Sequence, residues 1–152
     1  MEINFEKEIG DYLSLLQKNI RGNLAASGSN ASGDASRTLA VYVDEVSGLL
    51  DGVSYFENIE KGTAPKAMGG GVSFYDILDW VDYKGIISKG DKAAKSVAGM
   101  ITRKINADGT LLYRSGGRTD IYTNEIENDS LMNDFTEDVT DKALDILFDF
   151  KL

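Results

Sequence analysis

The chain has 152 residues, of which 42% are hydrophobic, and it contains neither cysteine nor histidine. A domain of this length buries roughly 68–70% of its unfolded surface, so we expect residues 1–152 to fold as a single domain without a disulfide. The missing cysteines exclude thiolate metal sites, and the missing histidines remove the commonest transition-metal ligand and the usual proton shuttle near neutral pH. Many enzyme classes are thereby excluded.

The start of the chain does not resemble a targeting signal. Glu2, Glu6 and Glu8 stand where a secretory signal carries basic residues, and no apolar run approaches the ~20 residues that span a bilayer. We therefore expect a soluble protein that is made in a cytoplasm and has no membrane partner.

The net charge of −9 is distributed unevenly. Residues 1–119 contain 15 acidic and 14 basic side chains, whereas residues 120–152 contain ten acidic and two basic ones. Within the balanced part, residues 84–118 carry eight basic side chains against two acidic ones. Two interpretations remain open: solvated surfaces that favour solubility, or head-to-tail association of a basic surface with the acidic surface of the next copy.

The first element is an N-terminal helix in the segment 1–21. Apolar side chains recur with helical spacing and predict a helix over residues 4–21, the members being Phe5, Ile9, Tyr12, Leu13, Leu16 and Ile20. Residues 22–36 are rich in Gly, Ser, Ala and Asn, which predicts a flexible loop that becomes ordered against a partner. We expect the fold to survive deletion of residues 24–34.

A small antiparallel sheet should follow the loop. Leu39, Val41 and Val43 alternate with less apolar residues, which predicts a strand, and Asp51-Gly52 suggests the turn of a hairpin. A single helical turn is expected around residues 55–59, ending at Gly62.

Two central helices are predicted next. Ser73 and Asp76 resemble a capping box that opens a helix ending near Gly85, and a second apolar stripe runs from Ala94 to Ile105. Residues 111–122 permit either a second hairpin or an irregular loop.

A long C-terminal helix over residues 129–150 completes an α+β fold. Its apolar face runs from Leu131 to Phe150, and most of its acidic residues lie elsewhere around it, namely Asp134, Asp138, Asp141, Asp145 and Asp149. These acids either face a channel, where they would repel passing DNA, or form a solvated outer face.

No catalytic constellation emerges from the sequence. Gly69-Gly70-Gly71 lacks the Lys-Ser or Lys-Thr of a phosphate-binding loop, and a Ser-His-acid triad cannot form without histidine. The spacing of Asp76, Asp79 and Asp82 fits a solvated helix face better than a metal site. Trp80 suits packing or an interface better than base stacking. We predict no enzyme activity, no metal and no cofactor.

Four short motifs follow one another across residues 30–110, and together they resemble a known family. They are Ala31-Ser32-Gly33 with Thr38-Leu39; Tyr55 with Glu60-Lys61-Gly62-Thr63 and Pro65; Ile77 and Trp80 with Lys84-Gly85-Ile86; and Arg103-Lys104-Ile105 with Gly109-Thr110. This order is similar to that of the tail-completion, or head-tail joining, proteins of tailed bacteriophages, with residues 37–110 as the family-like core.

The resemblance implies a non-catalytic virion protein of the phage neck. Such a subunit would form a six- or twelve-fold ring between the portal or connector and the tail tube or tail hub, with genomic DNA passing nearby without specific binding. The residues that the resemblance assigns to docking are Gly33, Tyr55, Glu60, Gly62, Thr63, Pro65, Trp80, Lys84 and Gly85.

Two alternatives from other classes remain. The basic segment 84–118 would suit a small intracellular adaptor or a nucleic-acid-binding regulator, whose binding would depend steeply on salt. A carboxylate-based, metal-dependent hydrolase is the enzyme alternative, and a divalent metal would then stabilise the fold.

Overall fold

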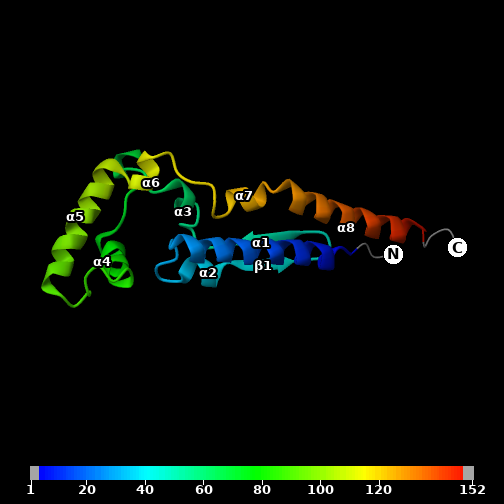
Figure 1. The fold of residues 1–152 in the computed structure, drawn as a ribbon, viewed down its shortest axis with the longest axis horizontal. Coiled ribbons are helices and arrows are strands. Elements are labelled where there is room, and N and C mark those ends of the chain that lie inside the picture. Colours follow the sequence, from blue (N-terminus) through cyan, green and yellow to red (C-terminus); the bar gives the residue numbers. More distant parts are fainter. Residues whose placement is uncertain (1–3, 149–152) are drawn as a thin grey trace.

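The computed structural model describes residues 4–148 and shows an elongated α+β protein with two hydrophobic cores. Long helices from both ends of the chain and a β-hairpin form one half, which we call the long half, and two central helices form the other, the short half (Figure 1). The predicted fold class is confirmed.

Helix α1 (Glu6–Ser27) is the spine of the long half. It extends beyond the predicted end because Leu24 continues the apolar stripe of Leu16 and Ile20 and is fully buried, while Gly22 is exposed. Gly28, with φ of 67°, caps its end.

The predicted flexible loop 22–36 is therefore wrong at both ends. Residues 22–27 belong to α1, and helix α2 (Asp34–Thr38) places Ala35 in the core, so only residues 28–33 lack regular structure. Deleting residues 24–34 would remove Leu24 from the core and the first residue of α2, which argues against the expectation that the fold survives this deletion.

Strands β1 (Ala40–Val43) and β2 (Gly48–Asp51) form the only sheet of the described residues, an antiparallel hairpin. The strand prediction is confirmed, but the turn comprises residues 44–47 instead of Asp51-Gly52. The Asp44 carboxylate fixes this turn by accepting hydrogen bonds from the Val46 and Ser47 backbone N–H groups at 3.0 and 2.7 Å.

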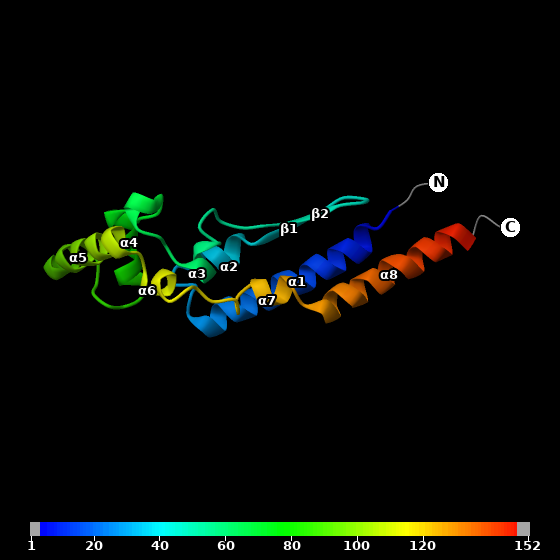
Figure 2. The same cartoon turned by 90° about the horizontal axis from the view of Figure 1, so that it is seen from above.

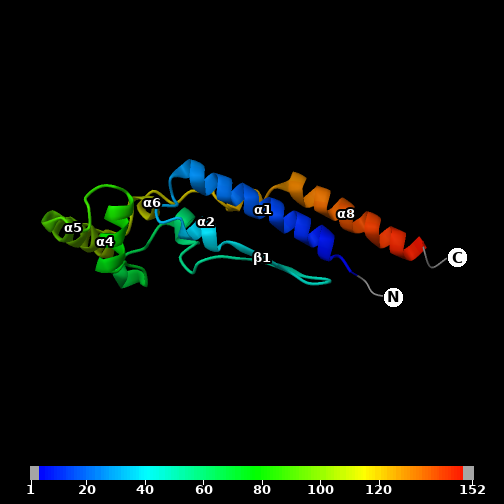
Figure 3. The same ribbon diagram turned by 90° about the horizontal axis from the view of Figure 1, so that it is seen from below.

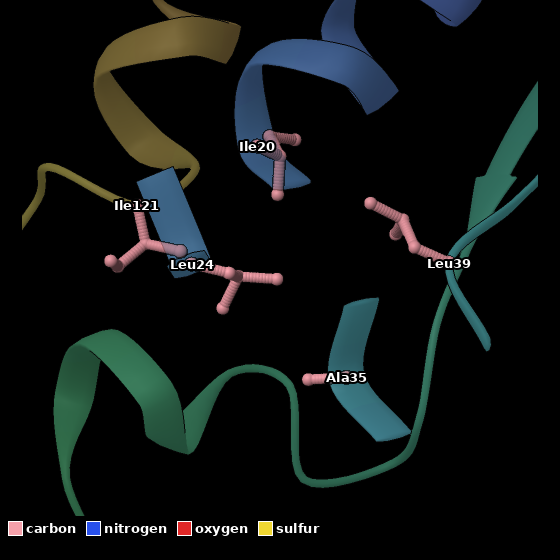
Figure 4. Packing of buried hydrophobic residues seen from close by; sticks show 5 residues of the cluster. All are labelled: Ile20, Leu24, Ala35, Leu39 and Ile121. Carbon is pink, nitrogen blue, oxygen red and sulfur yellow. The ribbon is translucent and has the colours of Figure 1, made fainter. Parts of the chain in front are cut away.

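The hairpin packs one face against α1. Gly48 lies so close to the helix that an added Cβ would stand 2.5 Å from the side chains of Ile9 and Leu13. The first core lies where α1, α2 and the residue before β1 meet the segment 119–122 (Figure 4). Its buried members are Ile20, Leu24, Ala35, Leu39 and Ile121.

Helix α8 (Asp129–Phe148) runs antiparallel to α1 on the side away from the hairpin (Figures 2 and 3). Tyr12 and Phe135 stack with ring centroids 4.7 Å apart, and Lys142 pairs with Glu8 at 3.0 Å. None of the twenty residues of α8 is buried, so one side of this helix alone is covered. The helix is confirmed to Phe148, and the last two residues of the predicted range lie outside the described part.

The second core lies between α4 (Phe74–Tyr83) and α5 (Lys92–Asp108), and both helix predictions are confirmed. The Ser73 hydroxyl caps α4 by accepting a hydrogen bond from the Tyr75 N–H at 3.1 Å. Ala94 and Ala98 of α5 are fully buried against α4, because their small side chains let the helices approach closely.

Short elements join the two halves: α3 (Asn58–Lys61), η1 (Lys66–Met68), α6 (Leu111–Arg114) and α7 (Thr123–Ile126). Residues 111–122 thus form the irregular alternative and not a second hairpin. The outgoing and returning chains bond to each other, since Thr110 N–H donates to the Thr63 carbonyl at 2.9 Å and Thr63 N–H donates to the Thr110 hydroxyl at 3.0 Å. We call this region, residues 60–65 and 109–123, the junction.

Gly62 makes the close approach at the junction possible. Its φ of 74° and ψ of 179° lie where side chains are strained, and an added Cβ would stand 2.3 Å from the Tyr113 backbone nitrogen. We expect Gly62→Ala to lower the free energy of unfolding by about 3 kcal/mol or more, as measured by urea denaturation.

Gly69→Ala is the matched control. Gly69 also has a positive φ, of 83°, but no atom lies within 4 Å of its added Cβ, so we expect a loss of only about 1–2 kcal/mol. Equal losses in the two variants would show that contact with residue 113 is unimportant.

Candidate functional site

A groove of about 530 Å³ lies between the two halves of the molecule. The long half contributes the loop after α1, including Asn30 and Ser32, together with Tyr55. The short half contributes Trp80 and Tyr83 from one face of α4, where these residues are three positions apart and therefore neighbours. Segments distant in sequence thus form one concave surface.

Several of the predicted docking residues meet at this groove. Tyr55 and Trp80 line it and are 44% and 38% exposed. Gly33, whose φ is 81°, lies in the chain between two residues that line the groove. The Lys84 ammonium donates a hydrogen bond to the Gly28 carbonyl, which links the end of α4 to the end of α1. Gly85 follows in an exposed position with φ of 66°.

The groove combines aromatic rings with carboxylates. The carboxylates are those of Asp34, Asp76 and Asp79. Asp34 forms an ion pair with Arg37, and Asp79 forms one with Lys89. The hydrogen bond with Asp79 raises the pKa of Lys89. Among residues 4–148, Asp76 has no basic side chain within ion-pairing distance. Aromatic faces beside a carboxylate attract cationic side chains, so the groove suits a polar segment of another protein that carries lysine or arginine.

Glu60 has a different role from the one predicted. Its side chain is only 2% exposed, and one carboxylate oxygen accepts hydrogen bonds from the N–H groups of Ile121, Tyr122 and Thr123 at 2.8, 2.6 and 3.0 Å. The Thr123 hydroxyl donates to the other oxygen. A side chain used in this way is not available for docking, and that prediction is wrong for Glu60.

The neighbours of Glu60 in its motif also serve the junction. Gly62 is buried, so its docking prediction is wrong as well, and Thr63 bonds to Thr110. Pro65 is partly buried, and its carbonyl accepts hydrogen bonds from Met68 and Gly70 at 3.0 and 3.1 Å. The motif therefore holds the junction together, while Tyr55 and Trp80 line the groove.

The ionisation of Glu60 depends on this hydrogen bonding. Burial alone would raise the pKa of its carboxyl group, but the bonds from Thr123, Tyr122 and Ile121 favour the carboxylate more strongly. The pKa of Glu60 therefore lies below its usual value of 4.5. Sequence reasoning missed this role because the three donors are more than sixty residues away in the chain.

The predicted acidic face of α8 lies at the surface. Asp134, Asp138, Asp141 and Asp145 are exposed, while Asp149 lies outside the described residues. Whether these acids face a channel stays a prediction.

Within residues 4–148, no group of three or more acidic side chains is arranged to hold a metal ion. In the same part of the chain, no helix has both the length and the apolar character needed to cross a bilayer.

Comparison with known proteins adds no relative. No protein-family model, no curated protein and no solved structure matches the chain. The functional interpretation therefore depends on the motifs and on the surfaces described above.

Replacing Glu60 by glutamine should weaken the junction. We expect Glu60→Gln to lower the free energy of unfolding by about 1–3 kcal/mol at pH 7, because an amide cannot accept all the bonds that the carboxylate accepts. The carboxylate contribution is fully present above pH 4.5 and is lost as pH falls through the lower pKa of the folded state. Urea denaturation at several pH values should therefore show the two proteins converging in acid.

Glu57→Gln provides the control, since Glu57 is exposed and its ion pair with Lys61 lies at the surface. We expect it to change stability by about 0.5 kcal/mol or less. A gap between Glu60→Gln and the natural protein that stays constant down to pH 3 would contradict the assignment.

Proposed function

We propose that the chain is a tail-completion subunit of the neck of a tailed bacteriophage. In this role it forms a six- or twelve-fold ring between the portal or connector and the tail tube or tail hub. The observation that carries the proposal is that residues of three dispersed motifs converge: Tyr55, Trp80 and the residues beside Gly33 line one groove, while Glu60 and Thr63 bond across the junction between the two halves. Residues from three of the four family-like motifs thus line the same groove.

The mechanism we propose is assembly without catalysis. The bonds between Glu60 and residues 121–123 fix the junction, so the groove keeps its shape before a partner arrives. A preformed site loses less conformational entropy on binding, which favours docking of a segment from a connector or tail protein. The subunit would be made in the host cytoplasm and would end in the virion.

Genomic DNA would pass nearby without being bound specifically. Helix α8 presents Asp134, Asp138, Asp141 and Asp145 to solvent, and such a face would repel DNA if it lined the channel. If α8 lay on the outer rim of the ring, this part of the proposal would fail.

A nucleic-acid-binding regulator or adaptor is the second candidate. The observation in its favour is the exposed surface of α5, which carries Lys92, Lys95, Arg103 and Lys104. A gel-shift titration separates the two proposals: salt-sensitive binding to DNA supports the regulator, and no binding at low salt supports the neck subunit.

The groove gives the test of the main proposal. We expect Tyr55→Ala combined with Trp80→Ala to leave a folded protein, since both side chains are partly exposed, but to cause at least a tenfold loss of tailed particles. Electron microscopy of particles should show filled heads without tails.

Tyr75→Ala is the matched control, because Tyr75 is an exposed aromatic residue of α4 that does not line the groove. It should give the normal number of complete particles. Normal particles from the groove variant, with circular dichroism showing it folded, would overturn the docking role, and complete particles from a strain without the protein would overturn the proposed function.

A further inference from the structure

The outer face of the hairpin carries an uncovered apolar pair. Tyr42 and Leu49 stand directly opposite each other in the register and are 59% and 58% exposed. Their neighbours Val41 and Leu50 are less exposed, because strand residues alternate between the outer face and the face against α1. Val46 at the turn is also exposed. Nothing in residues 4–148 covers this face.

Acidic residues flank the apolar pair at both ends. Asp51 pairs with Ala40 at one end of the outer face, and Asp44 follows β1 at the other, two residues beyond Tyr42. Residues 40–51 contain three acids, including Glu45, and no base. At about 3.3 Å per residue, the two ends of this face lie about 13 Å apart.

Helix α5 has an outer face of the opposite charge. Ala94 and Ala98 point into the second core, so the 100° step per residue places Lys92, Ser96, Met100 and Arg103 on the other side of the helix. Met100 is an exposed apolar side chain between the two basic ones. At about 1.5 Å per residue, Lys92 and Arg103 are about 16 Å apart along the axis.

We propose that the outer face of the hairpin in one copy binds the outer face of α5 in a second copy. Met100 then packs on Tyr42 and Leu49, while Lys92 and Arg103 lie beside the acidic ends of the hairpin. The two spacings, about 13 and about 16 Å, fit because long basic side chains adjust by several ångströms. The inference deepens the proposed function by naming the contact that joins neighbouring subunits.

The position of the two faces makes the contact heterologous. The hairpin turn points toward the end of the molecule where α1 begins, and α5 lies at the opposite end (Figures 1 and 2). A pair of copies therefore keeps one unused hairpin face, on one copy, and one unused α5 face, on the other. Such contacts produce a ring if the rotation closes and a filament if it does not.

Two charge-reversed proteins test the contact. The first carries Glu45→Lys and Asp51→Lys, which makes both faces basic; Asp44 is left unchanged because it holds the turn. The second carries Lys92→Glu and Arg103→Glu, which makes both faces acidic. We expect the natural protein to associate at low salt in sedimentation velocity, and each variant alone to associate at least about tenfold more weakly.

An equimolar mixture of the two variants should restore association, because every basic face then finds an acidic one. The control is Asp138→Lys with Asp145→Lys on α8, which changes the net charge as much as the hairpin variant does but should leave association unchanged. Circular dichroism checks that each variant is folded.

The inference is overturned if the natural protein stays monomeric at low salt, if the hairpin and α8 variants weaken association equally, or if mixing restores nothing. Failure of the proposed function would look different. Complete tailed particles from a strain without the protein would remove the neck role, while restored association in the mixture would still establish the contact.

Discussion

The buried carboxylate of Glu60 is the constraint on which the arrangement of the molecule depends. It joins α3 to the start of α7 through three backbone N–H groups, and one donor belongs to Ile121, a member of the first core. The outgoing chain and the returning chain are therefore held together where they leave the long half. Burying a carboxylate without hydrogen-bond donors would cost free energy, so the Glu60 charge is stable in this position only while the donors of residues 121–123 are in place.

An elongated protein with two small cores has its weakest region between them. Each core contains few buried side chains, and the junction relies on hydrogen bonds and on close backbone contact at Gly62. Local unfolding should therefore begin by separation of the halves, with the groove residues changing position first. Because the groove lies at this boundary, its shape depends on the hydrogen bonds of the junction and on the close contact at Gly62.

Periodicity in the sequence was sufficient to predict the long helices and the hairpin strand, but not their ends. The apolar stripes of α4 and α5 are confirmed because each buries one face locally. The composition of residues 22–36 suggested disorder, yet Leu24 and Ala35 are buried in the first core. The free energy gained by burying these side chains outweighs the low helix propensity of the Gly- and Ser-rich segment. The hairpin turn was misplaced because Asp44 fixes it with its own side chain. The role of Glu60 depends on partners remote in sequence, which no local pattern reveals.

Trp80 is the only tryptophan in the chain, and it lies at the boundary between the halves. Its indole ring is partly in water and partly against protein, so its fluorescence emission depends on what fills the groove. Any segment that enters should displace water from the ring and shift the emission to shorter wavelength. The protein thus contains its own optical probe, without labelling, at the surface where a partner is expected.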